Sequence, residues 1–262
     1  MEKIKVGIIG CGHLGTMHLK NIRELERERN DIELKGIYDL DIGKSKIVAE
    51  ENNTKYYFSL DDIINDIDAA LIVSPTSTHF DIALKTISNN IHTFIEKPVT
   101  DKLENAYLLR ADRDGHGKTV VQIGHIERFN PALLSVEKYN LKPLFIESHR
   151  LSQYNPRGTD VSVIQDLMIH DIDIILSLVK SRVKEIDANG VAIMTDKFDI
   201  ANARLQFENG CVANITASRI SQKKMRKMRI FQSDAYISID FSDNKSEVFR
   251  LEETKKSGTV IG

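Results

Sequence analysis

The stretch Gly10-Cys11-Gly12-His13-Leu14-Gly15 decides the fold of this chain, because it joins a strand to a helix. The run before it, Lys5–Ile9, is rich in branched apolar residues, as expected of a strand buried on both faces. Helical spacing follows from His13 to Arg29. In such a loop the first glycine permits a tight turn, the second lets a pyrophosphate approach the backbone, and the third lets helix and strand pack closely. The pattern predicts a dinucleotide site formed by Gly10, Gly12, His13, Leu14 and Gly15; the alternative is a plain glycine turn.

Strands and helices continue to alternate up to residue 124. We expect further strands at Leu34–Tyr38, Asp68–Val73, His92–Ile95 and Thr119–Ile123. The helices expected between them are Ile42–Glu51, Thr78–Ser88 and Leu103–Asp112. Short connections in such an alternation predict a doubly wound parallel sheet, the α/β Rossmann arrangement, with helices on both faces. Residues 1–124 would form this first domain.

The pattern changes after residue 124. Helices are expected at Asn130–Tyr139 and Val163–Val179, with a strand at Phe145–Leu151 between them. Five more strands are expected, at Ile186–Ile193, Ile200–Phe207, Cys211–Ser218, Met225–Gln232 and Ala235–Asp240. Polar and apolar residues alternate along the second and third of these, which predicts a mostly antiparallel sheet with one open polar face. Residues 125–262 would therefore form an α+β domain that binds substrate and pairs copies through that face, as a homodimer or homotetramer.

Composition excludes several classes of protein. The formal net charge is −2 over 262 residues, so no global field favours nucleic acid. The basic run Arg219–Arg229 has no interleaved aromatic residue, so a solvated hairpin is favoured over nucleic-acid binding, with a subunit interface second. Cys11 and Cys211 give neither a disulfide framework nor a metal cluster. No signal peptide begins the chain and no apolar run approaches the ~20 residues that span a bilayer, so a cytoplasmic protein without a membrane partner is expected.

Two further loops follow strands at the edge where open α/β sheets bind ligands. Asp39 ends the second strand, where a carboxylate can accept hydrogen bonds from both ribose hydroxyls and repel a 2′-phosphate. No arginine follows it, so NAD is favoured over NADP; the alternative is a turn aspartate. The loop after the third strand carries Ser74, Thr76 and His79. These residues can cap a helix and also contact the cofactor.

Candidates for catalysis come from both predicted domains. Glu96-Lys97-Pro98 follows the fourth strand, and a lysine there could stabilise a developing alkoxide. Asp166, His170 and Asp173 form a narrow polar stripe on an apolar helix. If the stripe lines a site, His170 can exchange a proton at neutral pH while Asp166 hydrogen-bonds the ring or the substrate. The alternatives are a solvated lysine and the wet face of a buried helix.

These pieces resemble the Gfo/Idh/MocA oxidoreductase family. The matching segments are GCGHLG, the strand-end Asp39, SPTSTHFDIA, Glu96-Lys97-Pro98, and the helix with Asp166 and His170, in the family's order over essentially the whole chain. The segments Gly124–Pro131 and Asn155–Gly158 look closer to the branch that acts on UDP-N-acetylhexosamines. The family pattern usually continues beyond residue 262, into a C-terminal helical segment.

The resemblance implies oxidation by NAD of the C3 hydroxyl of UDP-N-acetylglucosamine to a 3-keto sugar, in a pathway to 3-amino sugars of lipid A or another surface glycan. It implies that Lys97 binds the C3 hydroxyl, that His170 accepts its proton and that Asp166 positions the sugar or the histidine. The sequence leaves open which of Lys97 and His170 is the formal base. It places Glu96 at the cofactor, and Arg128, Asn130, Arg150 and Arg157 at the substrate. The interpretation requires Lys97 and His170 to converge beside the nicotinamide. The alternatives are a dehydrogenase of another polyol, such as UDP-N-acetylglucosaminuronate, inositol or a free sugar, and a non-catalytic NAD-binding scaffold.

Overall fold

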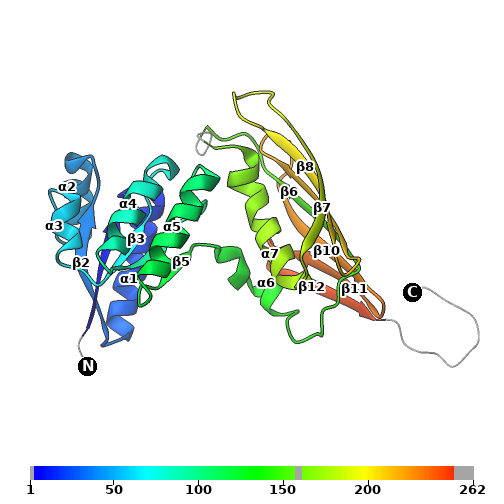
Figure 1. The fold of residues 1–262 in the computed structure, drawn as a ribbon, viewed down its shortest axis with the longest axis horizontal. Helices are drawn as coiled ribbons and strands as arrows, with labels where there is room; N and C mark the ends of the chain where they lie inside the picture. Colours follow the sequence, from blue (N-terminus) through cyan, green and yellow to red (C-terminus); the bar gives the residue numbers. More distant parts are fainter. Residues whose placement is uncertain (1–2, 157–160, 251–262) are drawn as a thin grey trace, which may run out of the picture. The chain divides into compact units, whose positions relative to one another are not determined.

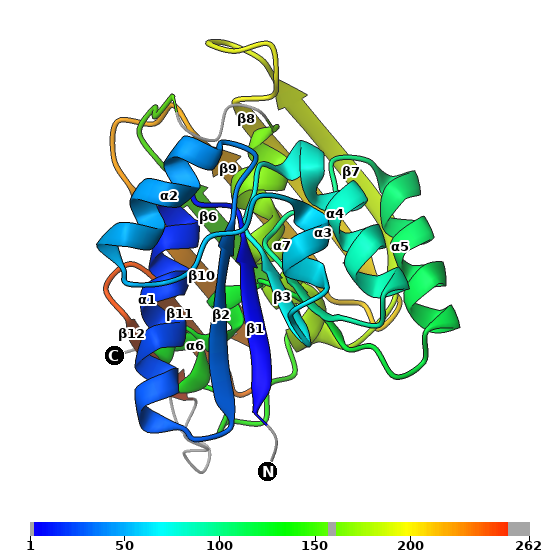
Figure 2. The same ribbon diagram turned by 90° about the vertical axis from the view of Figure 1, so that its left-hand side faces the viewer.

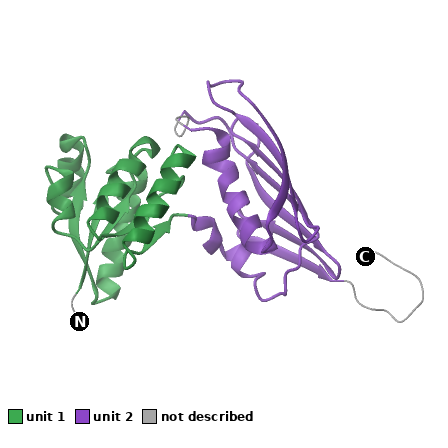
Figure 3. Cartoon of the chain, viewed as in Figure 1, with its two compact units in different colours: residues 1–124 green, residues 125–262 purple. Residues whose placement is uncertain are grey.

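The computed structural model describes residues 3–156 and 161–250. Two compact units make up the chain, unit 1 (Met1–Gly124) and unit 2 (His125–Gly262), which Figure 3 shows in different colours. Each unit has its own sheet and its own buried core.

Unit 1 is a parallel five-stranded sheet with the strand order β2-β1-β3-β4-β5. Its strands are β1 (Ile4–Ile9), β2 (Ile32–Tyr38), β3 (Ala69–Ile72), β4 (His92–Ile95) and β5 (Val121–Ile123). Its helices are α1 (His13–Glu28), α2 (Ile42–Glu51), α3 (Leu60–Ile64), α4 (Thr76–Ser88) and α5 (Leu103–Gly115). The predicted doubly wound parallel sheet is confirmed.

Helices cover both faces of this sheet, as Figure 2 shows. On one face, α3, α4 and α5 bury Ile63, Ile87 and Leu109. On the other, α1 and α2 bury Leu19 and Ala49. Apolar strands buried on both faces are what the branched runs in the sequence predict.

The strands of unit 1 end together. Ile9 of β1 pairs with Tyr38 of β2 and with Ile72 of β3, and Ile72 pairs with Ile95 of β4. The loops that follow these four strands therefore leave the same edge of the sheet. Open α/β sheets bind ligands at this edge.

Unit 2 is a seven-stranded sheet with the order β12-β11-β10-β6-β9-β8-β7. Its strands are β6 (Phe145–Leu151), β7 (Val183–Val191), β8 (Ile200–Phe207), β9 (Val212–Ser218), β10 (Met225–Gln232), β11 (Ala235–Asp240) and β12 (Lys245–Arg250). Its helical segments are η1 (Ile126–Phe129), α6 (Pro131–Leu134), the π-helical turn η2 (Ile164–Met168) and α7 (Ile169–Val179). All neighbouring strands are antiparallel except β6 and β9. The predicted mostly antiparallel sheet is confirmed.

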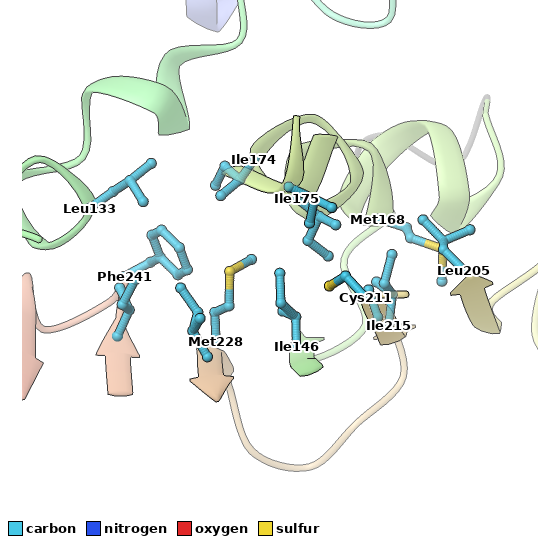
Figure 4. Close-up of a cluster of buried hydrophobic side chains, with 14 of the residues drawn as sticks. Leu133, Ile146, Met168, Ile174, Ile175, Leu205, Cys211, Ile215, Met228 and Phe241 are labelled. Atoms are coloured by element: carbon cyan, nitrogen blue, oxygen red, sulfur yellow. The ribbon is translucent and has the colours of Figure 1, made fainter. Parts of the chain in front are cut away.

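The helices of unit 2 pack on one face of this sheet (Figure 1). Figure 4 shows the core between them, where Ile174 and Ile175 of α7 lie over Ile146, Ile215 and Met228 of the strands. These side chains are almost completely buried. Burial of branched and sulfur-containing side chains at this density is the main source of stability for such a layer.

The opposite face of the sheet is polar, as the alternation predicts. Asn202 donates to Thr216 at 2.9 Å, and Arg204 donates to Asn214 at 3.0 Å. The basic run on β10 is also balanced by acids, because Arg226, Lys227 and Arg229 lie near Glu127, Asp240 and Glu147. Arg219, the first residue of the predicted run, is instead buried and donates to the Val161 carbonyl oxygen at 2.7 Å, so the run is not solvated throughout.

In unit 2, three predicted elements differ from the structure by more than one residue. The helix expected at Asn130–Tyr139 is limited to α6, because the Ser135 hydroxyl returns to the Ala132 carbonyl and the chain continues in tighter turns. The helix expected at Val163–Val179 begins with the wider turn η2. The strand expected at Ile186–Ile193 is Val183–Val191 instead. The short segments η1 and α3 and the strand β12 were not expected, since none shows a complete amphipathic period.

The loop between β7 and β8 offers a test of stability. The Asp199 side chain is fully buried and accepts hydrogen bonds from the N–H groups of residues 193, 194 and 195 and from the Thr195 hydroxyl. Burial alone would raise the pKa of Asp199, but these donors outweigh it and hold the pKa well below its usual range. The ionised carboxylate therefore stabilises the fold above the ordinary aspartate pKa of about 4, and the contribution is lost as the pH falls below it.

Asp199→Asn should lower the free energy of unfolding at pH 7 by roughly 1.5–3 kcal/mol, the worth of a hydrogen bond to a charged group. The loss should shrink as the pH falls from about 4 toward 2, because the unfolded wild type then binds a proton at Asp199 that the folded state does not bind. Urea denaturation across this pH range measures both effects. An Asp199→Asn deficit that does not change with pH would show that the charge contributes nothing.

Candidate functional site

The glycine loop after β1 has the geometry of a phosphate site. Gly10 has a φ of +111°, and a Cβ there would lie 2.6 Å from the Ser74 nitrogen. A Cβ at Gly15 would overlap the Gly10 carbonyl oxygen, so helix and strand pack too closely for any other residue. A Cβ at Gly12 would meet nothing within 4 Å. Packing therefore requires Gly10 and Gly15, whereas Gly12 leaves open space at the start of α1, where a pyrophosphate fits.

The residues between these glycines leave that space open. His13 and Leu14 are exposed in the first turn of α1, and no side chain caps this helix. Cys11 is buried instead. Burial, with a smaller effect of Asp39, raises the pKa of the Cys11 thiol to about 11, so the thiol adds no negative charge near a bound phosphate at neutral pH.

Asp39 at the end of β2 is held against the glycine loop. Its Oδ2 accepts from the Cys11 N–H at 2.7 Å, and its Oδ1 accepts from the Asp41 N–H at 3.1 Å. The Lys44 Nζ lies 3.4 Å from Oδ2. The carboxylate is thus fixed at the sheet edge, where it can accept further hydrogen bonds from ribose hydroxyls.

A cavity of about 630 Å³ opens beside Asp39. It is mostly apolar and is lined by Ile9, Gly10, Tyr38, Asp39, Leu40, Asp41, Leu60, Ser74, Pro75, Thr78, Asp81 and Ile82. Its size and apolar walls suit an adenine ring with its ribose against the carboxylate. The residues of unit 1 therefore fit the adenosine half of a dinucleotide.

Asp39→Ala should weaken NAD binding about tenfold, since one lost charge-assisted hydrogen bond costs roughly 1.5–3 kcal/mol. The preference for NAD over NADP should narrow as well, because the repulsion of a 2′-phosphate is gone. Titration calorimetry with both dinucleotides measures the two effects. Asp39→Asn is the matched variant that keeps an acceptor for Cys11, and the exposed Asp61→Asn is the surface control. If the ratio of the Kd for NADP to the Kd for NAD is the same in Asp39→Ala as in the wild type, Asp39 does not select the cofactor.

The loop after β3 is tied to the loop after β4 by His79. Its Nδ1 lies 2.9 Å from the Pro98 carbonyl oxygen, and its Nε2 lies 2.9 Å from the Ser74 carbonyl oxygen. The ring is 1% exposed. Ser74 and Thr78 share a hydrogen bond of 2.7 Å at the cavity wall, and Thr76 is half-buried in the first turn of α4. His79 therefore supports the loops from beneath, with both ring nitrogens occupied by backbone.

The Glu96-Lys97-Pro98 loop follows β4 at the same edge. Glu96 Oε1 lies 2.8 Å from His18 Nε2 of α1, and Glu96 Oε2 accepts from the Lys97 N–H at 3.2 Å. The Lys97 side chain is half-buried. His18 was not expected from the sequence, since no local pattern links a helix residue to a loop 78 residues away.

The three polar residues predicted to form a stripe lie on two successive helical segments of unit 2, η2 and α7. Asp166 lies in the π-helical turn η2 and His170 in the first turn of α7, and both are half-buried. The carboxylate of Asp173 is paired with Arg128, whose guanidinium donates to both Asp173 oxygens at 2.6 Å. The hydrogen bond to Asp173 raises the pKa of Arg128. The Asp173 carboxylate is thus held in place by Arg128.

Arg150 is enclosed within unit 2. Its side chain is 2% exposed and donates to Asp171 at 2.8 and 3.1 Å and to Glu127 at 3.0 Å. Burial raises the pKa of the Asp171 carboxyl, and the neighbouring guanidinium opposes that rise. Removing one member of such a buried pair leaves an uncompensated charge, so this cluster is a structural requirement of the unit.

The other predicted substrate residues are placed as follows. Asn130 accepts from the Ala132 N–H and donates to the Phe241 carbonyl oxygen at 3.2 Å, so it caps α6. Arg157 lies outside the described residues. Glu127 and Asp171 were missed, because their only sequence signal is an acid on an otherwise apolar or short helical segment.

Comparison with known proteins identifies the family. Residues 4–125 match the family described as "Oxidoreductase family, NAD-binding Rossmann fold", and residues 138–238 match the GFO/IDH/MocA C-terminal domain. The chain belongs to the Gfo/Idh/MocA oxidoreductase family. The predicted family, oxidoreductase class and NAD cofactor are confirmed.

Sequence identity and structural superposition relate the chain to individual members of the family. It is 37% identical to UDP-N-acetylglucosamine 3-dehydrogenase of Acidithiobacillus ferrooxidans over 100% of this chain and 80% of that protein. A solved structure of that enzyme superposes with a TM-score of 0.88 at 35% identity, covering 98% of this chain and 85% of the other. The scyllo-inositol 2-dehydrogenase (NAD(+)) of Bacillus subtilis is 27% identical over 84% of this chain and 68% of its own length.

The fold is also shared with GenD2 from gentamicin A biosynthesis in complex with NAD, at a TM-score of 0.79 and 15% identity over 92% of this chain and 73% of the other.

Within residues 3–156 and 161–250, no helix has the length and apolar character to cross a membrane. The same described part brings together no group of three or more histidine, cysteine or acidic side chains able to hold a metal ion.

Proposed function

We propose that this protein oxidises the C3 hydroxyl of a UDP-N-acetylhexosamine, UDP-N-acetylglucosamine, to the 3-keto sugar with NAD. The observation that carries the proposal is the 37% identity to a UDP-N-acetylglucosamine 3-dehydrogenase along the whole chain. The inositol dehydrogenase relative has lower identity, 27%, and matches 84% of the chain. The adenosine-sized cavity, Asp39 and the open space at Gly12 support the cofactor half of the proposal.

The reaction requires a proton acceptor and a donor to the developing alkoxide. When bound, the nicotinamide supplies the acceptor for the hydride that C3 loses. We assign Lys97 to the C3 hydroxyl, where its ammonium would stabilise negative charge on the oxygen. We assign His170 to the proton of that hydroxyl, and Asp166 to the orientation of the imidazole or the sugar. That Lys97 and His170 act on one sugar stays a prediction.

The cofactor contacts we propose are Gly10, Gly12, His13, Leu14, Gly15, Asp39, Ser74, Thr76 and Glu96. We place His79 behind them as a support, since its ring bonds two carbonyl groups. For the UDP-sugar we propose Arg128, Asn130 and Arg157. The two arginines suit its diphosphate, because their donors form a planar fork. Arg150 would act through the cluster with Asp171 and Glu127.

The decisive experiment mixes the protein with NAD and a panel of UDP-N-acetylglucosamine, UDP-N-acetylgalactosamine, UDP-N-acetylglucosaminuronate and myo-inositol. We expect absorbance of reduced nicotinamide to rise only with a UDP-N-acetylhexosamine, and most with the first. Oxidation of a secondary alcohol by NAD is uphill near neutral pH, so little ketone would accumulate. Hydroxylamine is therefore added to the assay to trap the ketone. Turnover of inositol alone would favour the polyol alternative, and absence of turnover with any alcohol would favour a non-catalytic NAD-binding scaffold.

The setting of the reaction is also a proposal. A 3-keto sugar is a substrate for an aminotransferase, so a 3-amino sugar for lipid A or another surface glycan would follow. Cys11 and Cys211 are both free and buried, in agreement with a reducing compartment such as the cytoplasm.

Copies of this chain should pair through the polar face of the unit 2 sheet, as a homodimer or homotetramer. Light scattering after size exclusion should give at least twice the mass of one chain. Arg204→Glu should lower that mass, because it places an unpaired acid among the polar side chains of the face. A wild type that elutes as a monomer at micromolar concentration would contradict this.

A further inference from the structure

The residues on both sides of Lys97 are held by histidines from different helices. Glu96 is bonded to His18 of α1, with 2.8 Å between Oε1 and Nε2. Pro98 is bonded through its carbonyl oxygen to His79 of α4 at 2.9 Å. The proposed function uses Lys97 itself and gives no role to His18.

The His18 contact fixes the side chain of Glu96 in one orientation. With Oε1 on His18, the other oxygen, Oε2, accepts from the Lys97 backbone N–H at 3.2 Å. Gly124 closes the remaining side, because a Cβ there would lie 3.0 Å from Glu96 Oε2. The His18 ring also lies against Phe94 of β4, with 5.5 Å between centroids. The carboxylate therefore connects α1 to the backbone of Lys97.

The other end of the loop is already fixed. His79 is 1% exposed and bonds both the Pro98 and Ser74 carbonyl oxygens, which joins the loops after β3 and β4. Pro98 is buried. The backbone around Lys97 is therefore held on its C-terminal side by His79, and Glu96 bonds the Lys97 N–H on the other side.

We propose that His18 is a positioning residue that sets the Lys97 backbone through Glu96. The contact is largely shielded from solvent, because the two side chains are only 21% and 16% exposed. Catalytic side chains need to be held within about 0.5 Å of the productive geometry, and a displacement of about 1 Å can cost 10²-fold in rate. The kinetic part of this inference rests on the proposed function.

The test compares His18→Leu with His18→Gln. The leucine variant loses the donor to Glu96, so amide hydrogen exchange at Lys97 should be at least severalfold faster. Its kcat with UDP-N-acetylglucosamine should fall about tenfold, while the Kd for NAD stays within about twofold. Glutamine offers an amide N–H donor to Glu96 and should restore most of both losses.

His116→Leu is the matched control, because this histidine bonds Asp112 in α5 and should change neither measurement. Glu96→Gln in the His18→Leu background should add little to the loss of kcat, since the two residues act as one unit. Unchanged exchange at Lys97 in His18→Leu would overturn the inference, whatever the kcat. A wild type without turnover of any UDP-sugar would instead count against the proposed function, and the exchange measurement would still decide the role of His18.

Discussion

Lys97→Met should lower kcat with UDP-N-acetylglucosamine by about 10²–10³-fold, the usual cost of losing one donor to a developing oxyanion. Methionine has similar length and lacks the charge, so the half-buried position at the end of β4 stays filled. The Kd for NAD should change little, because the proposed cofactor contacts are made by other residues. Single-turnover absorbance of reduced nicotinamide measures the chemical step, and fluorescence titration measures NAD binding.

Lys102→Met is the control for this experiment. Lys102 is an exposed lysine at the start of α5, five residues along the chain from Lys97. Its replacement should leave kcat and KM unchanged. Loss of an oxyanion donor should lower kcat far more than threefold. If Lys97→Met retains more than about a third of the wild-type kcat, the ammonium does not stabilise the alkoxide.

Much of unit 1 is predictable, because its signals are local. β4 and α2 have the predicted bounds, His92–Ile95 and Ile42–Glu51. The glycine loop is equally local, since the positive φ of Gly10 and the close contact at Gly15 follow from a tight strand-to-helix turn. Parallel register then brings the strand-end loops to one edge without further information.

Long-range pairing in unit 2 is the part that the sequence does not reveal. Arg150 and Asp171 are 21 residues apart and meet only because α7 packs across β6. An arginine on a strand resembles a ligand contact in the sequence, and only the packed layer shows that Asp171 and Glu127 occupy its donors. The connection from His18 to Glu96 is hidden for the same reason.

The turn that carries Asp166 shows a limit of periodicity. Spacing of four and three residues predicts one stripe for Asp166, His170 and Asp173 if the helix is a regular α-helix. The π-helical turn η2 changes the rotation per residue before α7 begins, and Asp173 is bonded to Arg128. Such turns inside helices occur frequently at functional sites. The distortion therefore agrees with a special role for Asp166 and His170.

His170→Ala should lower kcat by about 10²-fold or more and leave the Kd for NAD nearly intact, since a general base contributes 10²–10⁴-fold. The variant removes a half-buried ring at the start of α7, so a packing defect must be told apart from a lost base. Ser177→Ala, on the same helix, is the control for packing, because its hydroxyl bonds the Ile174 carbonyl oxygen within α7.

Chemical rescue separates the two explanations. If His170 accepts the proton, added imidazole should raise the kcat of His170→Ala toward the wild-type value, because a free base of similar pKa can replace it. Its kcat should also rise with pH over the neutral range, as hydroxide takes over the proton transfer. A variant that loses rate but responds to neither imidazole nor pH lacks structure rather than a base. Near wild-type turnover in His170→Ala would leave Lys97 as the residue to receive the proton, which is the alternative that the sequence leaves open.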